Sequence, residues 1–240
     1  MQFWRFLYPS ALGFTLKTTA QTLVDRLKGA PTRPVQAAQY VARHARKGDP
    51  EDVLRALDRF AQEERWLMSV GPKKGPLIKE LAQRLPANAR SLELGAYCGY
   101  SSIMIANAFG PQARITSIEI DHNAVASSRA NVEVAGLSDR VTFLHGASTN
   151  VIGSLEGRFD LVFLDHWKDL YKTDLQLIEQ RNLIGPGSIV VADNVGKIFA
   201  PEVYLDYVRN CGHYDCEHRQ ATIEYTSVPD AVEISVYRSR

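Results

Sequence analysis

The chain has 240 residues, of which 45% are hydrophobic and 23% charged, and its formal net charge is +1. This composition suits one large globular domain and excludes collagenous, repetitive and disulfide-stapled proteins. The near-neutral charge argues against nucleic acid as a partner, because proteins that bind it usually carry a concentrated basic face. The three cysteines, Cys98, Cys211 and Cys216, form no disulfide framework, so we expect a cytoplasmic protein.

Residues 1–34 differ in composition from the rest, and we interpret them as an extension to a single domain at 35–240. The extension has five basic residues and one acid, a charge of +4. No run of about 20 apolar residues follows its aromatic start, so neither a membrane-spanning anchor nor a secretory signal is expected. Its apolar residues fit one stripe of a basic helix that either contacts a membrane surface or a partner, or packs on the domain itself. The stripe comprises Leu12, Leu16, Leu23, Val24 and Leu27.

Helical spacing of apolar residues begins at Val35. The run Asp49-Pro50-Glu51 is typical of a helix start, with an acidic N-cap and a proline in the first turn. We expect this helix to end near Gly71-Pro72, and another helix to cover residues 75–85.

Short apolar runs separated by helical stretches follow Pro86. This alternation predicts a mainly parallel sheet with helices on both faces. The runs cover residues 91–94, 114–120, 140–145, 159–165, 187–193 and 232–237.

A glycine-containing turn leaves the first run in the segment LELGAYCGYSS (92–102). Gly95 and Gly99 allow the backbone to pass close to a ligand. The second run ends in Glu119, where an acid hydrogen-bonds the ribose hydroxyls of an adenosine-containing cofactor. The G-x-x-x-G spacing disfavours a dinucleotide loop, and the lack of a P-loop motif disfavours ATP hydrolysis.

Polar residues follow two later runs. Asp165 and Lys168 come after one run, and Asp193 and Asn194 come after the next. Each alone is more simply a helix cap or a solvated charge, but strand ends of a parallel sheet open into the same crevice. Three oxygen ligands beside an amine predict a divalent-cation site with a base next to it.

Cysteine and histidine alternate near the C-terminus, at Cys211, His213, Cys216 and His218. Their spacing is unlike that of common zinc modules, so we interpret the segment as a surface connection.

The motif E-x-G-x-x-x-G, with the acid that ends the second run, resembles the class I S-adenosylmethionine-dependent methyltransferases. Further segments resemble the catechol O-methyltransferase family among them. The similar segments are WLMSVGPKKG (66–75), LELGAYCGYS (92–101), IEI (118–120), GAS (146–148), VFLDHWKD (162–169), ADNV (192–195) and IEY (223–225). The resemblance implies an α/β fold, with a Rossmann-like sheet of about seven mostly parallel strands, an antiparallel last strand, helices on both faces and extra N-terminal helices.

The resemblance also implies sites for S-adenosylmethionine and for Mg²⁺. Glu119 would hold the ribose, and Ser148, His166 and Trp167 would surround the adenine. The methionine part would be lined by Val70, Glu93, Gly95, Tyr97 and Ser101. Asp165, Asp193 and Asn194 would bind the Mg²⁺, with Asp165 also beside the cofactor.

A small-molecule catechol is the implied acceptor. Lys168 would remove the proton from one hydroxyl and Glu224 would hold the other, so that these two residues are the catalytic ones. The acceptor would be surrounded by Trp66, Met68, Trp167, Lys168, Asn194 and Glu224.

The sequence departs from the family at three places. Pro72 stands where the family commonly has an acid, and Thr149 where it has a glutamine near the adenine. The segment 196–203 is about one residue longer than the family's gating loop, with Ile198 or Phe199 as the replacement gate.

Two alternatives stay open at this point. The same scaffold serves the caffeoyl-coenzyme A type of cation-dependent methyltransferase, which has a bulkier acceptor. The second alternative is a noncatalytic, methyltransferase-like binding protein that contacts its partner through residues 1–34.

Overall fold

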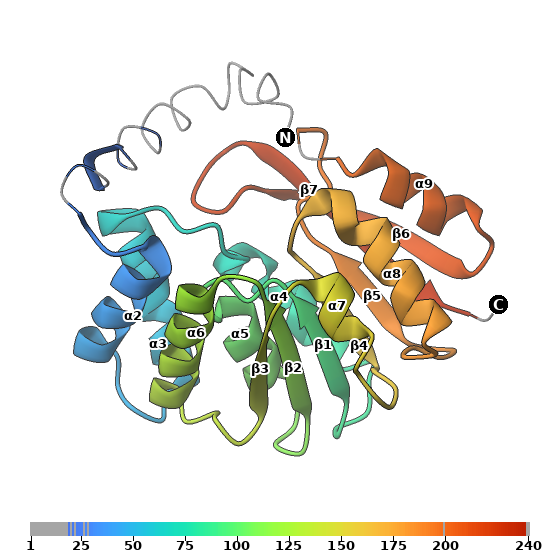
Figure 1. Ribbon diagram of the computed structural model, residues 1–240, viewed down its shortest axis with the longest axis horizontal. Helices are drawn as coiled ribbons and strands as arrows, with labels where there is room; N and C mark the ends of the chain where they lie inside the picture. Colours follow the sequence, from blue (N-terminus) through green and yellow to red (C-terminus); the bar gives the residue numbers. More distant parts are fainter. Residues whose placement is uncertain are drawn as a thin grey trace.

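The computed structural model describes residues 29–198 and 200–238, together with residues 19, 21, 23–25 and 27. Seven strands form one sheet in the order β3-β2-β1-β4-β5-β7-β6, with helices on both faces (Figure 1). The strands are β1 (Arg90–Leu94), β2 (Arg114–Glu119), β3 (Val141–His145), β4 (Leu161–Leu164), β5 (Ile189–Ala192), β6 (Tyr214–Thr222) and β7 (Pro229–Tyr237). The first five strands are parallel, and β7 is antiparallel to both of its neighbours. The expected Rossmann-like sheet with an antiparallel last strand is therefore confirmed.

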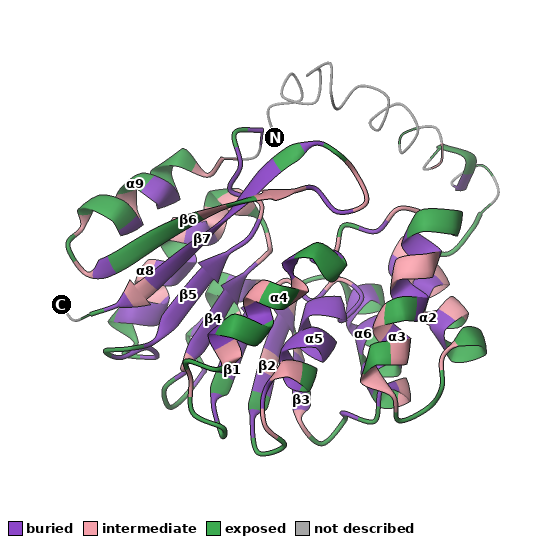
Figure 2. Cartoon of the chain, turned by 180° about the vertical axis from the view of Figure 1, so that it is seen from behind, coloured by how far each residue is buried: buried purple, intermediate pink, exposed green. Residues whose placement is uncertain are grey.

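Two layers of helices cover the sheet (Figures 1 and 2). The helices are α2 (Arg33–His44), α3 (Pro50–Arg59), η2 (Phe60–Glu64), α4 (Gly71–Ala82), α5 (Tyr100–Ala108), α6 (His122–Val134), α7 (Ser148–Ile152), η3 (Lys168–Leu170), α8 (Tyr171–Gln180) and α9 (Glu202–Asn210). Apolar residues of α2 to α6 pack on one face of the sheet, and those of α7 to α9 pack on the other. The central strands are buried on both faces, which explains why their sequences are continuous apolar runs.

The predicted helix start at Asp49 is confirmed, because its side chain accepts a hydrogen bond from the Asp52 amide at 3.0 Å. The predicted end is wrong. The helix closes at Glu64, and Gly71-Pro72 begins α4 instead of ending its predecessor. Proline is well suited to the first turn of a helix. Gly71 has φ +66°, and a Cβ there would lie 2.4 Å from Glu224 Oε2, so the position requires glycine.

Strand β6 is absent from the sequence prediction, which treated residues 211–218 as a surface connection. It is an edge strand that pairs with β7 from Tyr214 opposite Tyr237 to Thr222 opposite Pro229. Most of its residues are exposed, and Figure 2 shows much of the strand in the colour of exposed residues. Because its sequence is mainly polar, it lacks the apolar signal by which the other strands were recognised.

The extension at 1–34 lies largely outside the described residues, including Leu12 and Leu16 of the predicted stripe. Where the stripe is described, Leu23, Val24 and Leu27 are exposed. Asp25 is instead turned to the domain, with its carboxylate 3.0 Å from Arg65 Nη2. In the described part of the chain, no helix has the length and apolar character needed to cross a membrane.

Candidate functional site

The carboxyl ends of β1, β2, β4 and β5 meet at one edge of the sheet, where most of the predicted site residues lie. The turn after β1 crosses directly over the end of β4. Gly95 has φ +99°, and a Cβ on it would lie 2.6 Å from the Asp165 carbonyl oxygen. Only glycine therefore allows this turn to join the cofactor side of the edge to the predicted metal side.

Glu119 ends β2 and is fixed by backbone amides. Its Oε2 accepts hydrogen bonds from the amides of Ala96 (3.1 Å) and Tyr97 (2.9 Å), and its Oε1 accepts from Asp121 (2.9 Å). An ionised carboxylate has further acceptor capacity, which suits the two hydroxyls of a ribose. Glu119 can therefore accept hydrogen bonds from the ribose of the predicted nucleoside.

Glu93 lies in β1, just before the glycine turn, and is fully buried. It accepts hydrogen bonds from the hydroxyls of Ser102 and Ser117, with Ser101 nearby. Burial raises the pKa of Glu93. Val70, which is also assigned to the methionine part, is buried at the entry to α4.

A buried acid organises the predicted adenine side. Asp174 on α8 accepts hydrogen bonds from the Ser148 hydroxyl, from Thr149 Oγ1 at 2.8 Å and from His166 Nε2 at 2.9 Å. Burial opposes its charge, yet these donors lower the pKa of Asp174. His166 Nδ1 is buried and has no hydrogen-bond partner among the described residues, whereas Trp167 is half exposed. Sequence reasoning missed Asp174, although an acid among the apolar positions of a helix was a usable signal.

The residues predicted to bind the metal lie at the ends of two neighbouring strands. Asp165 follows β4, and Asp193 and Asn194 follow β5. Lys168 Nζ lies 3.3 Å from Asn194 Oδ1 and 3.9 Å from Asp165 Oδ1. It also donates to the hydroxyl of Tyr171 at 3.2 Å.

The electrostatic interaction between Asp165 and Asp193 favours the binding of a cation. Burial, and then the neighbouring Asp193, raise the pKa of Asp165 well above its ordinary value. Carboxylate and amide oxygens are ligands that Mg²⁺ prefers. The residues present therefore fit the predicted ion.

Two further residues of this region, Lys74 and Asp230, were missed. Lys74 Nζ lies 2.6 Å from Asp193 Oδ1 and 3.2 Å from Asp230 Oδ2. Lys74 is only 4% exposed, whereas its neighbour Lys73 is exposed. The sequence of two adjacent lysines does not indicate which one is buried, because that depends on how α4 sits against β7.

Glu224 follows β6 and is 2% exposed. Burial raises its pKa to about 7. Neither carboxylate oxygen has a hydrogen-bond partner of good geometry among the described residues. A buried acceptor without a donor suits the predicted contact with an acceptor hydroxyl.

The predicted acceptor-side residues Trp66 and Met68 precede α4. Trp66 Nε1 donates to the Glu224 carbonyl oxygen at 3.1 Å, and Met68 is 58% exposed. Ile198, one of the two gate candidates, is buried with Ile223 and Val228 beside Trp66. Phe199, the other candidate, lies outside the described residues.

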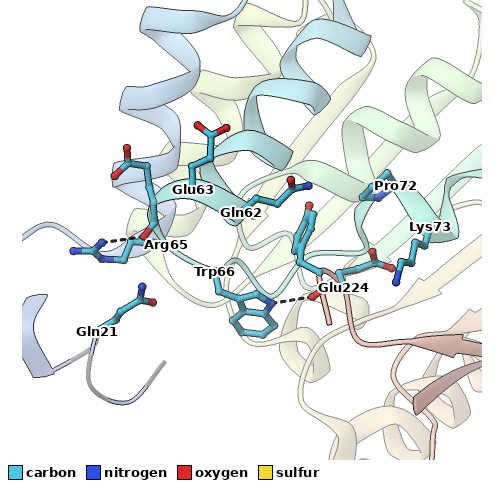
Figure 3. A pocket seen from close by; sticks show the side chains of 11 residues that line it. Gln21, Gln62, Glu63, Arg65, Trp66, Pro72, Lys73 and Glu224 are labelled. Atoms are coloured by element: carbon cyan, nitrogen blue, oxygen red, sulfur yellow. Dashed lines mark hydrogen bonds between the residues drawn. The ribbon is translucent and has the colours of Figure 1, made fainter. Parts of the chain in front are cut away.

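A cavity of about 700 Å³ adjoins this acceptor side (Figure 3). It shares Trp66 and Glu224 with the site, and its wall includes the end of η2 and the start of α4. Glu63 and Glu64 are exposed, and Arg65 is paired with Asp25. The cavity is lined by Gln21, Ala61, Gln62, Glu63, Glu64, Arg65, Trp66, Pro72, Lys73, Glu224 and Tyr225.

The cysteine and histidine residues near the C-terminus have other neighbours. Cys211 ends α9, whereas Cys216 and His218 lie on β6. Cys216 Sγ is 3.4 Å from Ser235 Oγ, and His218 Nδ1 is 2.8 Å from a carboxylate oxygen of Glu233.

Comparisons with known proteins show the family of the chain. The O-methyltransferase family model matches residues 45–205. The chain is 40% identical to catechol O-methyltransferase of Bos taurus over 83% of this chain and 75% of that protein, and 37% identical to that of Mus musculus over 91% and 83%. A solved O-methyltransferase from Bacillus cereus in complex with SAH has a TM-score of 0.66 at 21% identity, over 79% of this chain and 90% of that one. The chain therefore belongs to the O-methyltransferase family, a family of S-adenosylmethionine-dependent enzymes.

Proposed function

We propose that the chain transfers the methyl group of S-adenosylmethionine to one hydroxyl of a catechol, in a reaction that depends on Mg²⁺. The observation that carries this proposal is the convergence of Asp165, Asp193, Asn194 and Lys168 at one edge of the sheet, close to the buried Glu224. The similarity to catechol O-methyltransferases supports the acceptor class.

The cofactor would lie along the ends of β1 and β2. Glu119 would bind the ribose hydroxyls, and the group of residues around Asp174 would hold the adenine. The methionine part would then extend past Tyr97 toward Asp165. This path directs the sulfonium methyl to the edge at which the metal ligands meet.

Methyl transfer to oxygen requires an anionic nucleophile in line with the sulfonium group. Asp165, Asp193 and Asn194 would hold a Mg²⁺ that polarises the catechol oxygens as a Lewis acid. Lys168 would take the proton of the reacting hydroxyl, while Glu224 would hold the other hydroxyl and fix its position. An oxygen–carbon bond forms as the carbon–sulfur bond breaks, which yields a methyl ether and S-adenosylhomocysteine.

The cavity beside Glu224 bears on the choice of acceptor. Its lining contains three acids, Glu63, Glu64 and Glu224, and of its two bases Arg65 is already paired with Asp25. Such a lining repels phosphate groups, which opposes a coenzyme A thioester as acceptor. It accommodates a catechol that bears a neutral or cationic substituent.

Transfer of a labelled methyl group from S-adenosylmethionine to a small catechol tests the proposal, first with Mg²⁺ and then with excess chelator. We expect transfer that the chelator abolishes, and no competition by coenzyme A thioesters. If the cofactor binds but no vicinal dihydroxy aromatic is methylated, the proposal is wrong.

A further inference from the structure

Lys74 is a buried cation next to a predicted ligand of a dication. It lies on α4, far in sequence from both of its partners, and bridges Asp193 at the end of β5 to Asp230 in β7. Burying an ammonium is costly unless it is paired. Asp193 and Asp230 supply that pairing, at 2.6 Å and 3.2 Å from the Lys74 ammonium.

The contact with Lys74 gives the two carboxylate oxygens of Asp193 different roles. Oδ1 accepts from Lys74 at 2.6 Å and from the Asn194 amide at 2.7 Å. Oδ1 thus already accepts two hydrogen bonds from the protein. Oδ2 is the oxygen that remains for a metal ion.

Asp230 sets the orientation of the other ligand. Its Oδ2 accepts from Asn194 Nδ2 at 2.9 Å, and its Oδ1 accepts from the Gly196 amide at 3.1 Å. With Nδ2 bound to Asp230, the amide oxygen of Asn194 is turned to Lys168, from which it accepts at 3.3 Å. Lys74 shares the same Asp230 oxygen and so keeps that acceptor in place.

The positive charge of Lys74 also opposes the binding of a metal cation nearby. Lys74 is bonded to Asp193 and Asp230, and Lys168 lies 3.9 Å from Asp165, so two ammonium groups already lie beside the carboxyl groups of this region. An ammonium bonded directly to a ligand carboxylate reduces the attraction of that carboxylate for a dication, and the effect is strong where water is excluded.

We propose that Lys74, together with Asp230, is a built-in counter-cation of the metal site. It keeps Asp193 and Asn194 in their binding orientation before a divalent cation arrives, and it weakens the binding of that cation so that the cation exchanges readily. This inference rests on the proposed function, in which Asp165, Asp193 and Asn194 hold the cation.

Direct binding of Mn²⁺ to the full chain, followed by electron paramagnetic resonance without cofactor or acceptor, tests the proposal. We expect Lys74→Met to bind Mn²⁺ at least about tenfold more tightly than the wild type. We also expect its thermal stability without metal to be lower, and to recover more on addition of Mn²⁺. Lys79→Met removes an exposed lysine from the same helix and serves as the control.

A second variant keeps the test decisive if Lys74→Met does not fold. Lys74→Met/Asp230→Asn leaves no unpaired Asp230 carboxylate, and we expect its Mn²⁺ affinity to lie between those of the wild type and the single variant. Affinity that is unchanged or weaker in the folded variants means that the positive charge of Lys74 does not limit cation binding, and overturns the proposal. A wild-type chain that binds no Mn²⁺ contradicts the metal site itself, and with it the proposed function.

Discussion

The site has a predicted cofactor half around Glu119 and Asp174, and a predicted metal and acceptor half around Asp193 and Glu224, and these two halves are built differently. On the cofactor half, Glu119 receives its hydrogen bonds from backbone amides of Ala96, Tyr97 and Asp121, all within the first two strand-to-helix connections. On the metal half, Asp193 is held by Lys74, which lies more than a hundred residues earlier in the chain. The first half is therefore fixed by local backbone geometry, and the second by long-range contacts between side chains.

The halves also differ in how their carboxylates are satisfied. Asp174 on the cofactor half has three donors and a lowered pKa, whereas Asp165 and Glu224 on the other half have raised pKa values because they are buried with few donors. Glu93 on the predicted cofactor half is also buried with a raised pKa, but it accepts hydrogen bonds from Ser102 and Ser117. The contrast therefore lies in the supply of donors, and it leaves bonding capacity for a cation and a substrate on the predicted metal and acceptor half. Four substitutions test the contrast.

The largest effect is expected for Lys168→Ala, which acts on the metal and acceptor half. If the amine is the base, kcat should fall by about 100-fold to 10 000-fold, while the Kd for S-adenosylmethionine should stay within about threefold. Single-turnover kinetics and calorimetry measure the two quantities, with Lys172→Ala as the control. Equal losses of turnover and cofactor affinity would remove Lys168 from this role.

Glu119→Ala should have the opposite pattern. Loss of the charged acceptor for the ribose should raise the Kd for S-adenosylmethionine by about 10-fold to 100-fold, because hydrogen bonds to charged groups contribute about 1.5–3 kcal/mol. Mn²⁺ affinity should not change. Glu133→Ala, an exposed position on α6, is the control. A parallel loss of Mn²⁺ affinity would show that the two halves are not independent.

Glu224→Gln tests the unsatisfied carboxylate through pH. Its pKa is raised from 4.5 to about 7, so the unfolded chain releases this proton first and stability falls as pH rises between these values. Glutamine is neutral throughout and lacks this loss, so from pH 5 to pH 8 the variant should gain about 1–3 kcal/mol relative to the wild type. Urea denaturation without divalent cations at both pH values measures the gain. A difference that does not change with pH would contradict the burial of an ionisable Glu224.

The smallest effect is expected for Asp174→Asn on the cofactor half. Asparagine preserves the shape but removes the anionic acceptor that orients His166 and Ser148. The Kd for S-adenosylhomocysteine should rise by about twofold to tenfold, as for loss of one ordinary hydrogen bond. Calorimetry measures it, with the exposed Asp169→Asn as the control. Unchanged affinity would mean that Asp174 supports the fold and not the adenine site.

Much of the fold and of the site followed from local sequence signals. Continuous apolar runs marked the buried strands, and Asp165, Asp193, Asn194 and Glu119 could be placed because strand ends of a parallel sheet share one edge. Strand β6 was not predicted because an edge strand needs no apolar face. The helix boundary near Gly71 was predicted wrongly because glycine followed by proline is compatible with the start of a helix as well as with its end.

The sequence by itself determined the sheet, the glycine turn and the order of the predicted ligands, since these depend on neighbouring residues and on the direction of each strand. Only the tertiary structure decided that Lys74 and not Lys73 is buried, that Asp230 bonds to Asn194, and that Asp174 bonds to His166 on the predicted adenine side. These contacts join α4 to β5 and β7, and α8 to α7 and the end of β4. Burial and pairing of such charges depend on how distant elements pack together, and local periodicity carries no information on that.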